Sequence, residues 1–166
     1  EGNAITIDTN GNLIVAGIFT GSPAYPATFG NYSFISSSRG IGTPGGYATN
    51  LIIAKISPNG TWLSGINYHG DTGHTPTEIL TDSQGNVYCA GYFFSNITFD
   101  GFDYYAGGTS DSFVMKNLDQ GHSFSPAWIH TFTSQNSNFI EAMSSDLNAN
   151  LIVTGSFYGT LNYGQS

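Results

Sequence analysis

Three Asn-x-Ser/Thr triplets are the clearest chemical signals in the chain: Asn31-Tyr32-Ser33, Asn59-Gly60-Thr61 and Asn96-Ile97-Thr98. This triplet is the acceptor pattern for N-linked glycans and is typical of surface loops in secreted proteins. Asn59 lies in a predicted turn and Asn31 follows a Phe-Gly break, so we expect both to be exposed. The alternative is that the triplets are ordinary turn residues in a chain rich in Asn, Ser and Thr. Glycosylation of at least one of them is predicted for a host that has the enzymes.

Three aspartates recur in one motif. Asp8 and Asp82 each begin an Asp-x-x-Gly-Asn segment, with Gly11 and Gly85 at the fourth position, and Asp146 begins a related segment. Calcium needs about six to eight oxygen ligands, whereas each motif supplies a single acid. We therefore favour a tight turn over a calcium site. In such a turn the Asp accepts backbone N–H bonds and the Gly takes a positive φ.

Other groups of ionisable residues are weaker candidates for chemistry. His69, Asp71 and His74 share one short loop, but zinc needs three or four converging ligands, usually at more regular spacing. Asp100 and Asp103 form the best local acid pair and equally suit a solvated loop. No Gly-x-Ser-x-Gly elbow marks a serine nucleophile. We predict no catalytic residue, no metal and no cofactor; a carboxylate pair for glycoside hydrolysis depends on geometry that a sequence does not reveal.

Two lysines and the single cysteine lie at repeated positions, which favours structural roles. Lys55 and Lys116 occupy the same place in two copies of one motif, where pairing with a neighbouring acid or carbonyl is expected. Cys89 takes the place that Val15 and Val153 hold in sister copies, and it cannot form an internal disulfide. We expect a buried thiol that packs like a small apolar side chain; a reactive thiol is the alternative.

The composition excludes several classes of partner. Only 8% of the residues are charged, and three basic residues against eleven acidic ones give a net charge of −8. A nucleic-acid partner needs several cations on the protein surface, so none is expected. Attachment to anionic membranes is disfavoured for the same reason, and the longest apolar run, 13–19, is too short to span a bilayer. The sequence does not begin with Met, and we interpret it as a mature or excised segment of a secreted or surface protein.

The chain repeats itself. One element spans residues 7–19, 81–93 and 145–157, at separations of 74 and 64 residues; a second spans 50–60 and 111–121, at a separation of 61. Such self-similarity indicates a stack or ring of supersecondary units, none of which buries its apolar face alone. We predict one β-repeat domain over 1–166, with units at about 1–74, 75–138 and a partial 139–166.

Alternating apolar residues around the turn motifs predict antiparallel hairpins and an all-β fold with about four strands per unit. Ala149 replaces the turn Gly of the third copy, which predicts a strained turn there. We expect Trp62 and Trp128 to open equivalent strands, residues 65–73 to form a loop, and the Ser/Gly/Pro-rich stretch between 19 and 50 to be a long loop. The predicted strands are 4–8, 12–19, 51–56, 78–82, 86–94, 113–118, 139–146 and 150–158.

These motifs resemble a known family. The segment from Asp82 to Phe93, followed by Gly108 to Lys116, is similar to the bacterial β-propeller repeat often called the SBBP repeat, and Ile56 to Trp62 resembles its next turn. The resemblance covers nearly the whole chain except residues 22–46, where prolines interrupt it. It implies four-stranded propeller blades on secreted or surface proteins, and it implies no shared catalytic residues.

The repeat number has a consequence for function. Propellers close with about four to eight blades, and two and a half units do not close a ring, so strand edges stay open to pairing with another chain. Either the chain is cut from a larger propeller, or its copies complete a ring, or they join head to tail. We expect a non-enzymatic extracellular structural or adhesive protein whose copies assemble into a filament or a completed propeller. Its partners would be copies of itself, and glycans.

Two alternatives stay open. The aromatic segments 92–94 and 102–105 favour core packing, but exposed rings would suit a lectin-like module that stacks on sugars. The third reading is a fragment of a carbohydrate-active propeller enzyme, which would require converging carboxylates in a cleft.

Overall fold

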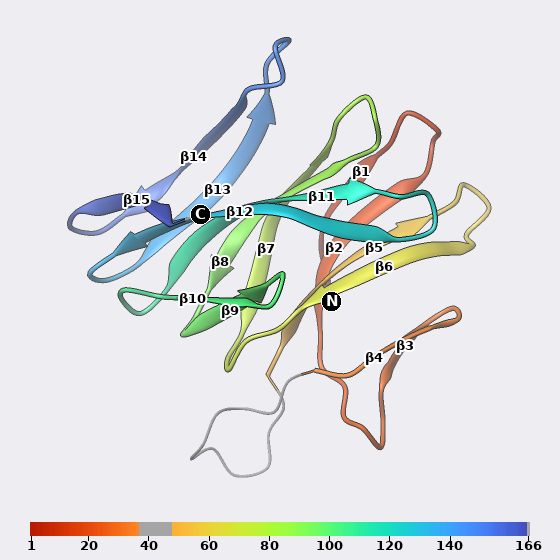
Figure 1. Cartoon of the computed structure of the whole chain (residues 1–166), viewed down its shortest axis with the longest axis horizontal. Coiled ribbons are helices and arrows are strands. Elements are labelled where there is room, and N and C mark those ends of the chain that lie inside the picture. Colours follow the sequence, from red (N-terminus) through yellow and green to blue (C-terminus); the bar gives the residue numbers. More distant parts are fainter. Residues whose placement is uncertain (37–47, 166) are drawn as a thin grey trace.

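The computed structural model describes residues 1–36 and 48–165, and these form strands and turns (Figure 1). The predicted all-β class is therefore confirmed. No helix in the described part of the chain is long and apolar enough to cross a membrane. The strands are β1 (Gly2–Ile7), β2 (Leu13–Phe19), β3 (Ala27–Phe29), β4 (Tyr32–Phe34), β5 (Asn50–Ile56), β6 (Trp62–Tyr68), β7 (His74–Thr81), β8 (Val87–Phe93), β9 (Asn96–Phe99), β10 (Phe102–Tyr105), β11 (Asp111–Asp119), β12 (Phe124–Ser134), β13 (Asn138–Ser145), β14 (Leu151–Phe157) and β15 (Leu161–Gln165).

Each of the first two units forms an antiparallel sheet of four strands, which we call its main strands. They lie side by side in the order in which they occur along the chain. Sheet 1 has the order β1-β2-β5-β6, and sheet 2 has the order β7-β8-β11-β12 with β15 added beside β12. The third unit contributes the hairpin β13–β14, which we call the third hairpin. The first hairpins of the three units follow one another from right to left in Figure 1.

The apolar core lies between the units. One buried cluster joins sheet 1 and sheet 2, with Ile14 and Ile53 on one side and Cys89 and Phe113 on the other. A smaller cluster joins the other face of sheet 2 to the third hairpin. Strands of sheet 2 alternate between these faces, because successive side chains point to opposite sides. Each sheet therefore buries one face against its neighbour, as expected for repeats that share a core.

The turn motif forms the same hydrogen bonds in all three copies. In the first copy, the Asp8 carboxylate accepts the backbone N–H of Asn10 at 2.9 Å and of Asn12 at 2.8 Å, and the side-chain amide of Asn12 at 2.8 Å. Asp82 and Asp146 accept the corresponding bonds. The Asn four residues after each Asp is thus a hydrogen-bond partner of the carboxylate. The motif contains this Asn, but its role was not predicted from the sequence.

Three glycines mark a repeated bulge. Gly17, Gly91 and Gly155 each face a shifted register in the first hairpin of their unit. A Cβ atom on Gly91 would lie 2.3 Å from the carbonyl oxygen of Thr75, and the other two positions are equally close to backbone. The glycine that closes each sequence repeat is thus required by the close approach of the facing strand.

A second, smaller hairpin lies between the second and third main strands. It is β3–β4 in the first unit and β9–β10 in the second. The sequences 27–34 (ATFGNYSF) and 97–104 (ITFDGFDY) correspond, and β15 matches the start of this insert in the third unit. The prediction of an unstructured loop between 19 and 50 was therefore wrong for residues 27–34, while 37–47 lie outside the described residues.

Two further predictions were wrong at the fourth main strand. Trp62 begins β6 and pairs with Ile56, but Trp128 lies inside β12 and pairs with Lys116, so the two tryptophans are not equivalent. The same register shift follows both lysines, but Lys55 pairs with Ser64, 9 residues later, whereas Lys116 pairs with Trp128, 12 residues later. The predicted loop at 65–73 is also shorter, because β6 continues to Tyr68.

Ala149 occupies the strained position that its repeat predicts, with φ of 62° against 78° for Gly11 and 84° for Gly85. A left-handed backbone costs a non-glycine residue about 1–2 kcal/mol, and Gly carries an entropic cost of about 0.5–1 kcal/mol. We expect Ala149→Gly to raise the unfolding free energy by about 0.5–1 kcal/mol, measured by urea denaturation. Gly11→Ala is the matched control, since its Cβ would have room; it should have the opposite sign. A loss of stability in both variants would contradict this explanation.

Candidate functional site

A buried ion cluster joins the first two units. The ammonium nitrogen of Lys55 lies 3.3 Å from a carboxylate oxygen of Asp8 and 2.5 Å from one of Asp119. The three side chains are 5%, 0% and 8% exposed, respectively. Asp8 belongs to sheet 1 and Asp119 to the end of β11 in sheet 2. An acid near Lys55 was expected from the sequence, but its identity was not, because Asp119 lies 64 residues away along the chain.

The pKa shifts of Asp8 and Lys55 favour the charged forms of these two groups. Burial opposes ionisation of Asp8, but hydrogen bonds from Asn12 and Lys55 outweigh it and hold the pKa of that carboxyl below its ordinary value. Burial likewise opposes the charge on Lys55, and the hydrogen bonds that its ammonium donates to Asp119 and Asp8 outweigh it and raise the pKa of Lys55. Both shifts favour the ion pair between Asp8 and Lys55 at neutral pH, because each charge compensates the cost of burying the other.

Lys116 is the equivalent of Lys55 in sheet 2, and its surroundings are less complete. Its ammonium lies 3.6 Å from Asp82, the equivalent of Asp8, and 4.9 Å from the centre of the Tyr88 ring. The Lys116 side chain is 20% exposed, four times as much as that of Lys55. A second carboxylate corresponding to Asp119 would have to come from a third main strand beside β14. No such strand pairs with β14 in the described part of the chain.

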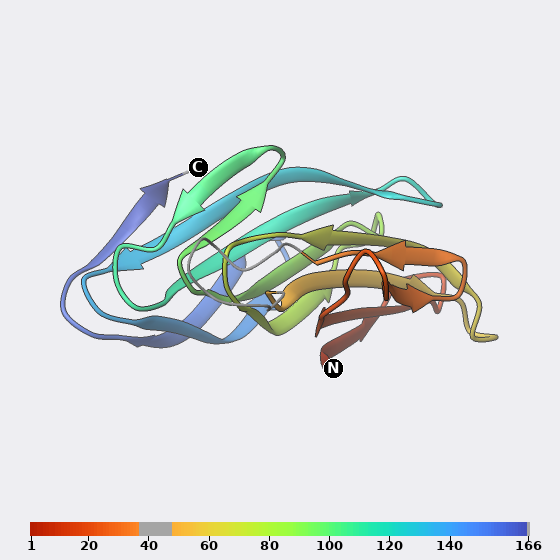
Figure 2. The same cartoon turned by 90° about the horizontal axis from the view of Figure 1, so that it is seen from below.

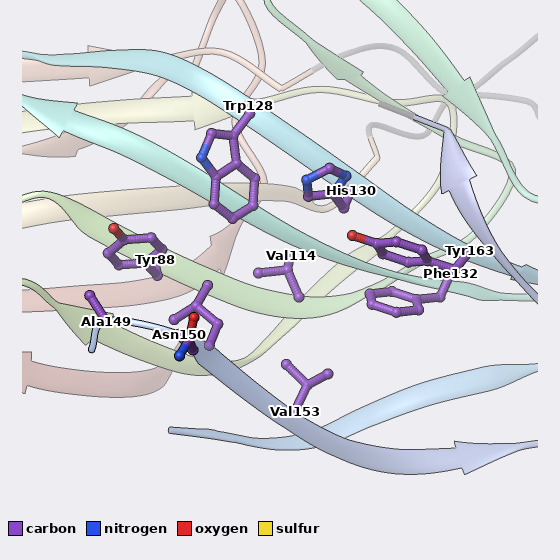
Figure 3. A pocket seen from close by; sticks show the side chains of 10 residues that line it. Tyr88, Val114, Trp128, His130, Phe132, Ala149, Asn150, Val153 and Tyr163 are labelled. Atoms are coloured by element: carbon purple, nitrogen blue, oxygen red, sulfur yellow. The ribbon is translucent and has the colours of Figure 1, made fainter. Parts of the chain in front are cut away.

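A cavity of about 350 Å³ opens next to this lysine, between sheet 2 and the third hairpin. Trp128, His130 and Phe132 project into it from β12, and Val153 faces them from β14 (Figure 3). The Phe132 ring lies 5.2 Å from that of Tyr163, on β15. The full lining is Tyr88, Val114, Trp128, His130, Phe132, Ala149, Asn150, Leu151, Val153 and Tyr163.

The corresponding surface of sheet 1 is covered. By strand pairing, Ser64 and Tyr68 of β6 are the equivalents of Trp128 and Phe132. Both are buried, and the hydroxyl of Tyr68 donates a hydrogen bond to the side-chain oxygen of Asn117 in β11. In sheet 1, this surface is buried against β11 and β12. In sheet 2, the same surface faces the third hairpin, and the aromatic cavity lies there.

Polar groups at the corner of sheet 2 fix the third hairpin in place. The Asp111 carboxylate accepts the backbone N–H of Ser134 at 3.0 Å and the side-chain amide of Asn138 at 2.6 Å. The side-chain oxygen of Asn138 accepts the backbone N–H of Ser112 at 2.8 Å. These residues are buried, so their hydrogen bonds hold β13 against β11 at one register.

The histidines of the predicted loop do not converge. His74 is fully buried between the backbone oxygens of Thr49 and Asn96, and burial lowers its pKa, so it is a neutral structural residue. The ring of His69 instead contacts the side chains of Asn67 and Asn50. Within residues 1–36 and 48–165 there is no group of three or more His, Cys, Asp or Glu side chains able to hold a metal ion.

The other sequence candidates have clear locations. Asn31 and Asn59 are exposed, whereas Asn96 is 5% exposed and its side-chain oxygen accepts the backbone N–H of Asp71 at 2.7 Å. A glycan fits the first two positions but not Asn96 in the folded chain. Cys89 is fully buried, and burial raises the pKa of its thiol, which opposes reactivity.

Asp82 and Asp146 both line one small cavity of about 210 Å³. Glycoside hydrolysis needs one carboxylic acid whose pKa is raised. Burial opposes ionisation of Asp82, but hydrogen bonds from Asn86 lower its pKa, and those from Asn150 lower the pKa of Asp146. Both carboxylates serve their turns and are poor proton donors.

A scan against models of known protein families matches none of them, and no curated protein matches the chain.

The two equivalent lysines make a matched pair for measuring the ion cluster. We expect Lys55→Met to lower the unfolding free energy by about 3–5 kcal/mol, because it leaves two carboxylates buried without a cation. Lys116→Met, at the more exposed position, should cost about 1 kcal/mol or less. Urea unfolding followed by tryptophan fluorescence would measure both. Equal losses would show that Asp119 does not distinguish the two sites.

Proposed function

We propose that this chain is an extracellular structural or adhesive repeat protein whose copies assemble through the surfaces at its two ends. The proposal includes a propeller-like arrangement of the sheets, similar to blades of the SBBP-type repeat. Consecutive strand order and four main strands per sheet support that arrangement. Secretion is supported by the low charge and by the two exposed sequons at Asn31 and Asn59.

The observation that carries the proposal is the exposure of interface residues at both ends. Ile79 of β7 is 1% exposed where sheet 2 packs on sheet 1, but its equivalent Ile5 of β1 is 62% exposed. At the other end, Ile152 of β14 is 54% exposed, while its equivalent Ile14 of β2 is fully buried. One end thus presents the surface that receives a preceding unit, and the other presents the surface that receives a following unit.

The two surfaces are equivalent to the two sides of the contact between sheets 1 and 2, and they lie at opposite ends of the molecule. The third hairpin and β15 are far from β3 and β4 when the chain is seen from below (Figure 2). A contact between unlike surfaces is heterologous, so each added copy leaves one end free. Copies then form a ring if the rotation between them closes, and a filament if it does not.

Charged substitutions at the two ends test this contact. Ile5→Asp and Ile152→Asp each place a carboxylate in one surface, and both sites are exposed, so the fold should be retained. We expect each variant to abolish assemblies that electron microscopy and sedimentation velocity detect for the unmodified chain. Phe102→Asp, at an exposed site on β10 of the second unit, is the control and should assemble normally.

A mixing experiment separates unlike from like contacts. Each end variant keeps one intact surface, so a mixture of Ile5→Asp and Ile152→Asp chains should form dimers and stop there. A contact between identical surfaces would give no new species on mixing. A monomeric unmodified chain at all concentrations would refute self-assembly.

A carbohydrate-binding module is the second candidate, because the cavity beside β12 combines Trp128, Phe132 and Tyr163. Aromatic faces stack on the apolar faces of sugar rings, while the edges of the site supply hydrogen bonds. We expect saturable binding on a glycan array that Trp128→Ala reduces at least tenfold, with Tyr25→Ala as the control. Equal loss in both variants, or no binding, would exclude this use of the cavity.

A further inference from the structure

Two Asn-Gly pairs lie in tight turns of the first unit: Asn10-Gly11 between β1 and β2, and Asn59-Gly60 between β5 and β6. In such a pair the backbone nitrogen of the Gly can attack the side-chain carbonyl carbon of the Asn, because glycine has no Cβ to hinder the approach. Asn is accordingly among the thermolabile residues of proteins. Whether a pair reacts depends on how firmly the fold holds its two reacting groups.

The backbone nitrogens of the two glycines are held in the same way. The N–H of Gly11 donates a hydrogen bond to the carbonyl oxygen of Asp8 at 3.0 Å. The N–H of Gly60 donates the equivalent bond to the carbonyl oxygen of Ser57 at 2.9 Å. Each bond must open before its nitrogen can attack, so this restraint slows both pairs alike.

The side-chain amides of the two asparagines are held differently. The side-chain oxygen of Asn59 accepts one hydrogen bond from the Ser57 hydroxyl and a second from the backbone N–H of Thr61 at 3.2 Å. Asn10 is exposed, and its side chain forms no hydrogen bond with the part of the chain that the structure describes. Its amide is therefore free to rotate toward the nitrogen of Gly11, whereas that of Asn59 must first break two hydrogen bonds.

The other two copies of the Asp turn each lack one of the reactants. The second copy has Gln84 before its glycine, and the third has Ala149 after its asparagine. A Gln side chain is one methylene longer and would have to close a larger ring, while the methyl group of Ala149 hinders the attack. Of the three copies, the first alone combines a short side-chain amide with an unhindered backbone nitrogen.

We propose that Asn10-Gly11 is a site of spontaneous deamidation and isoaspartate formation. The nitrogen of Gly11 loses its proton and bonds to the side-chain carbonyl carbon of Asn10, and the side-chain nitrogen leaves as ammonia. Water then opens the resulting succinimide ring at either carbonyl group, which gives aspartate or isoaspartate at position 10. The reaction takes place within one chain and is independent of the assembly of copies.

Isoaspartate at this position would act on the ion cluster of Lys55. Its backbone contains one additional carbon atom, so the turn would lengthen between residues 10 and 11. In the unmodified turn, the backbone N–H and the side-chain amide of Asn12 both lie 2.8 Å from the Asp8 carboxylate. Those bonds lower the pKa of Asp8 and hold its charge beside Lys55. Lengthening the turn would displace them and weaken the cluster that joins the first two units.

The site is tested by incubating the full chain, produced in a host that does not glycosylate it, in mildly alkaline buffer. Peptide mass mapping follows conversion of amide to carboxylic acid. We expect conversion at Asn10 to be about tenfold faster than at Asn59, because two more hydrogen bonds hold the latter. Labelling by an isoaspartate-specific methyltransferase should locate isoaspartate at position 10. Equal rates at the two positions, or faster conversion at Asn59, would overturn the proposal.

Two variants change the two asparagines separately. Asn10→Gln gives the first turn the residue that the second copy has, so it should abolish conversion at this position and retain the fold. Ser57→Ala removes the hydroxyl that donates to Asn59 and should accelerate conversion there several-fold. Hydrogen exchange of the Gly60 amide, measured in parallel, detects any opening of the turn itself. An unchanged rate at Asn59 would contradict the protective role of the side-chain hydrogen bonds.

The effect on the ion cluster is tested on the isoaspartate form after chromatographic separation. We expect its unfolding equilibrium constant in urea to be about tenfold larger, as for the loss of one hydrogen bond to a charged group. Asn10→Asp adds the same charge without the additional backbone atom, so it should unfold like the unmodified chain. Equal destabilisation of the two forms would assign the effect to charge, and unchanged stability of the isoaspartate form would refute the link to Lys55.

Discussion

The buried contact of Lys55 with Asp8 and Asp119 is the interaction on which the stacking of the units depends. Apolar surfaces between two sheets tolerate small displacements, because their attraction has little direction. A buried ammonium does not tolerate them, since moving it away from its carboxylates leaves a charge without compensation. The ion cluster therefore fixes the relative position of sheets 1 and 2, and the surrounding apolar side chains supply most of the stabilising burial.

The surroundings of Lys116, in the second sheet, differ from those of Lys55 in the number of carboxylates that compensate the charge. Lys116 has one carboxylate where Lys55 has two, and the sheet face beside it is open. Ile152 and Ile5 are exposed at places where the inner units bury their equivalents. The two ends of the repeat thus expose apolar side chains whose equivalents are buried at the interface between sheets 1 and 2. The assembly of copies that we propose would bring these exposed surfaces together.

Local features of the fold were accessible from the sequence, because they depend on neighbouring residues. The Asp-x-x-Gly-Asn turns and their flanking strands formed as predicted, and Ala149 adopted the positive φ that its position implied. Predictions of which residues occupy equivalent positions in paired strands were less successful. Trp62 and Trp128 were paired wrongly because the hairpin that joins β11 to β12 is longer than the one that joins β5 to β6, and alternation of side chains does not reveal that difference. The hairpin β3–β4 was missed because its strands are only three residues long.

By itself, the sequence determined the all-β class, the repeat, the turns and the low charge of this protein, since each follows from composition or short-range pattern. Only the tertiary structure decided which acid meets Lys55, that Asn96 is buried, and that Trp128, Phe132 and Tyr163 line one cavity. These facts depend on residues far apart in the chain that the stacking of sheets brings together. Sheet register and packing determine which residues meet between units, and neither can be predicted from the sequence of one repeat.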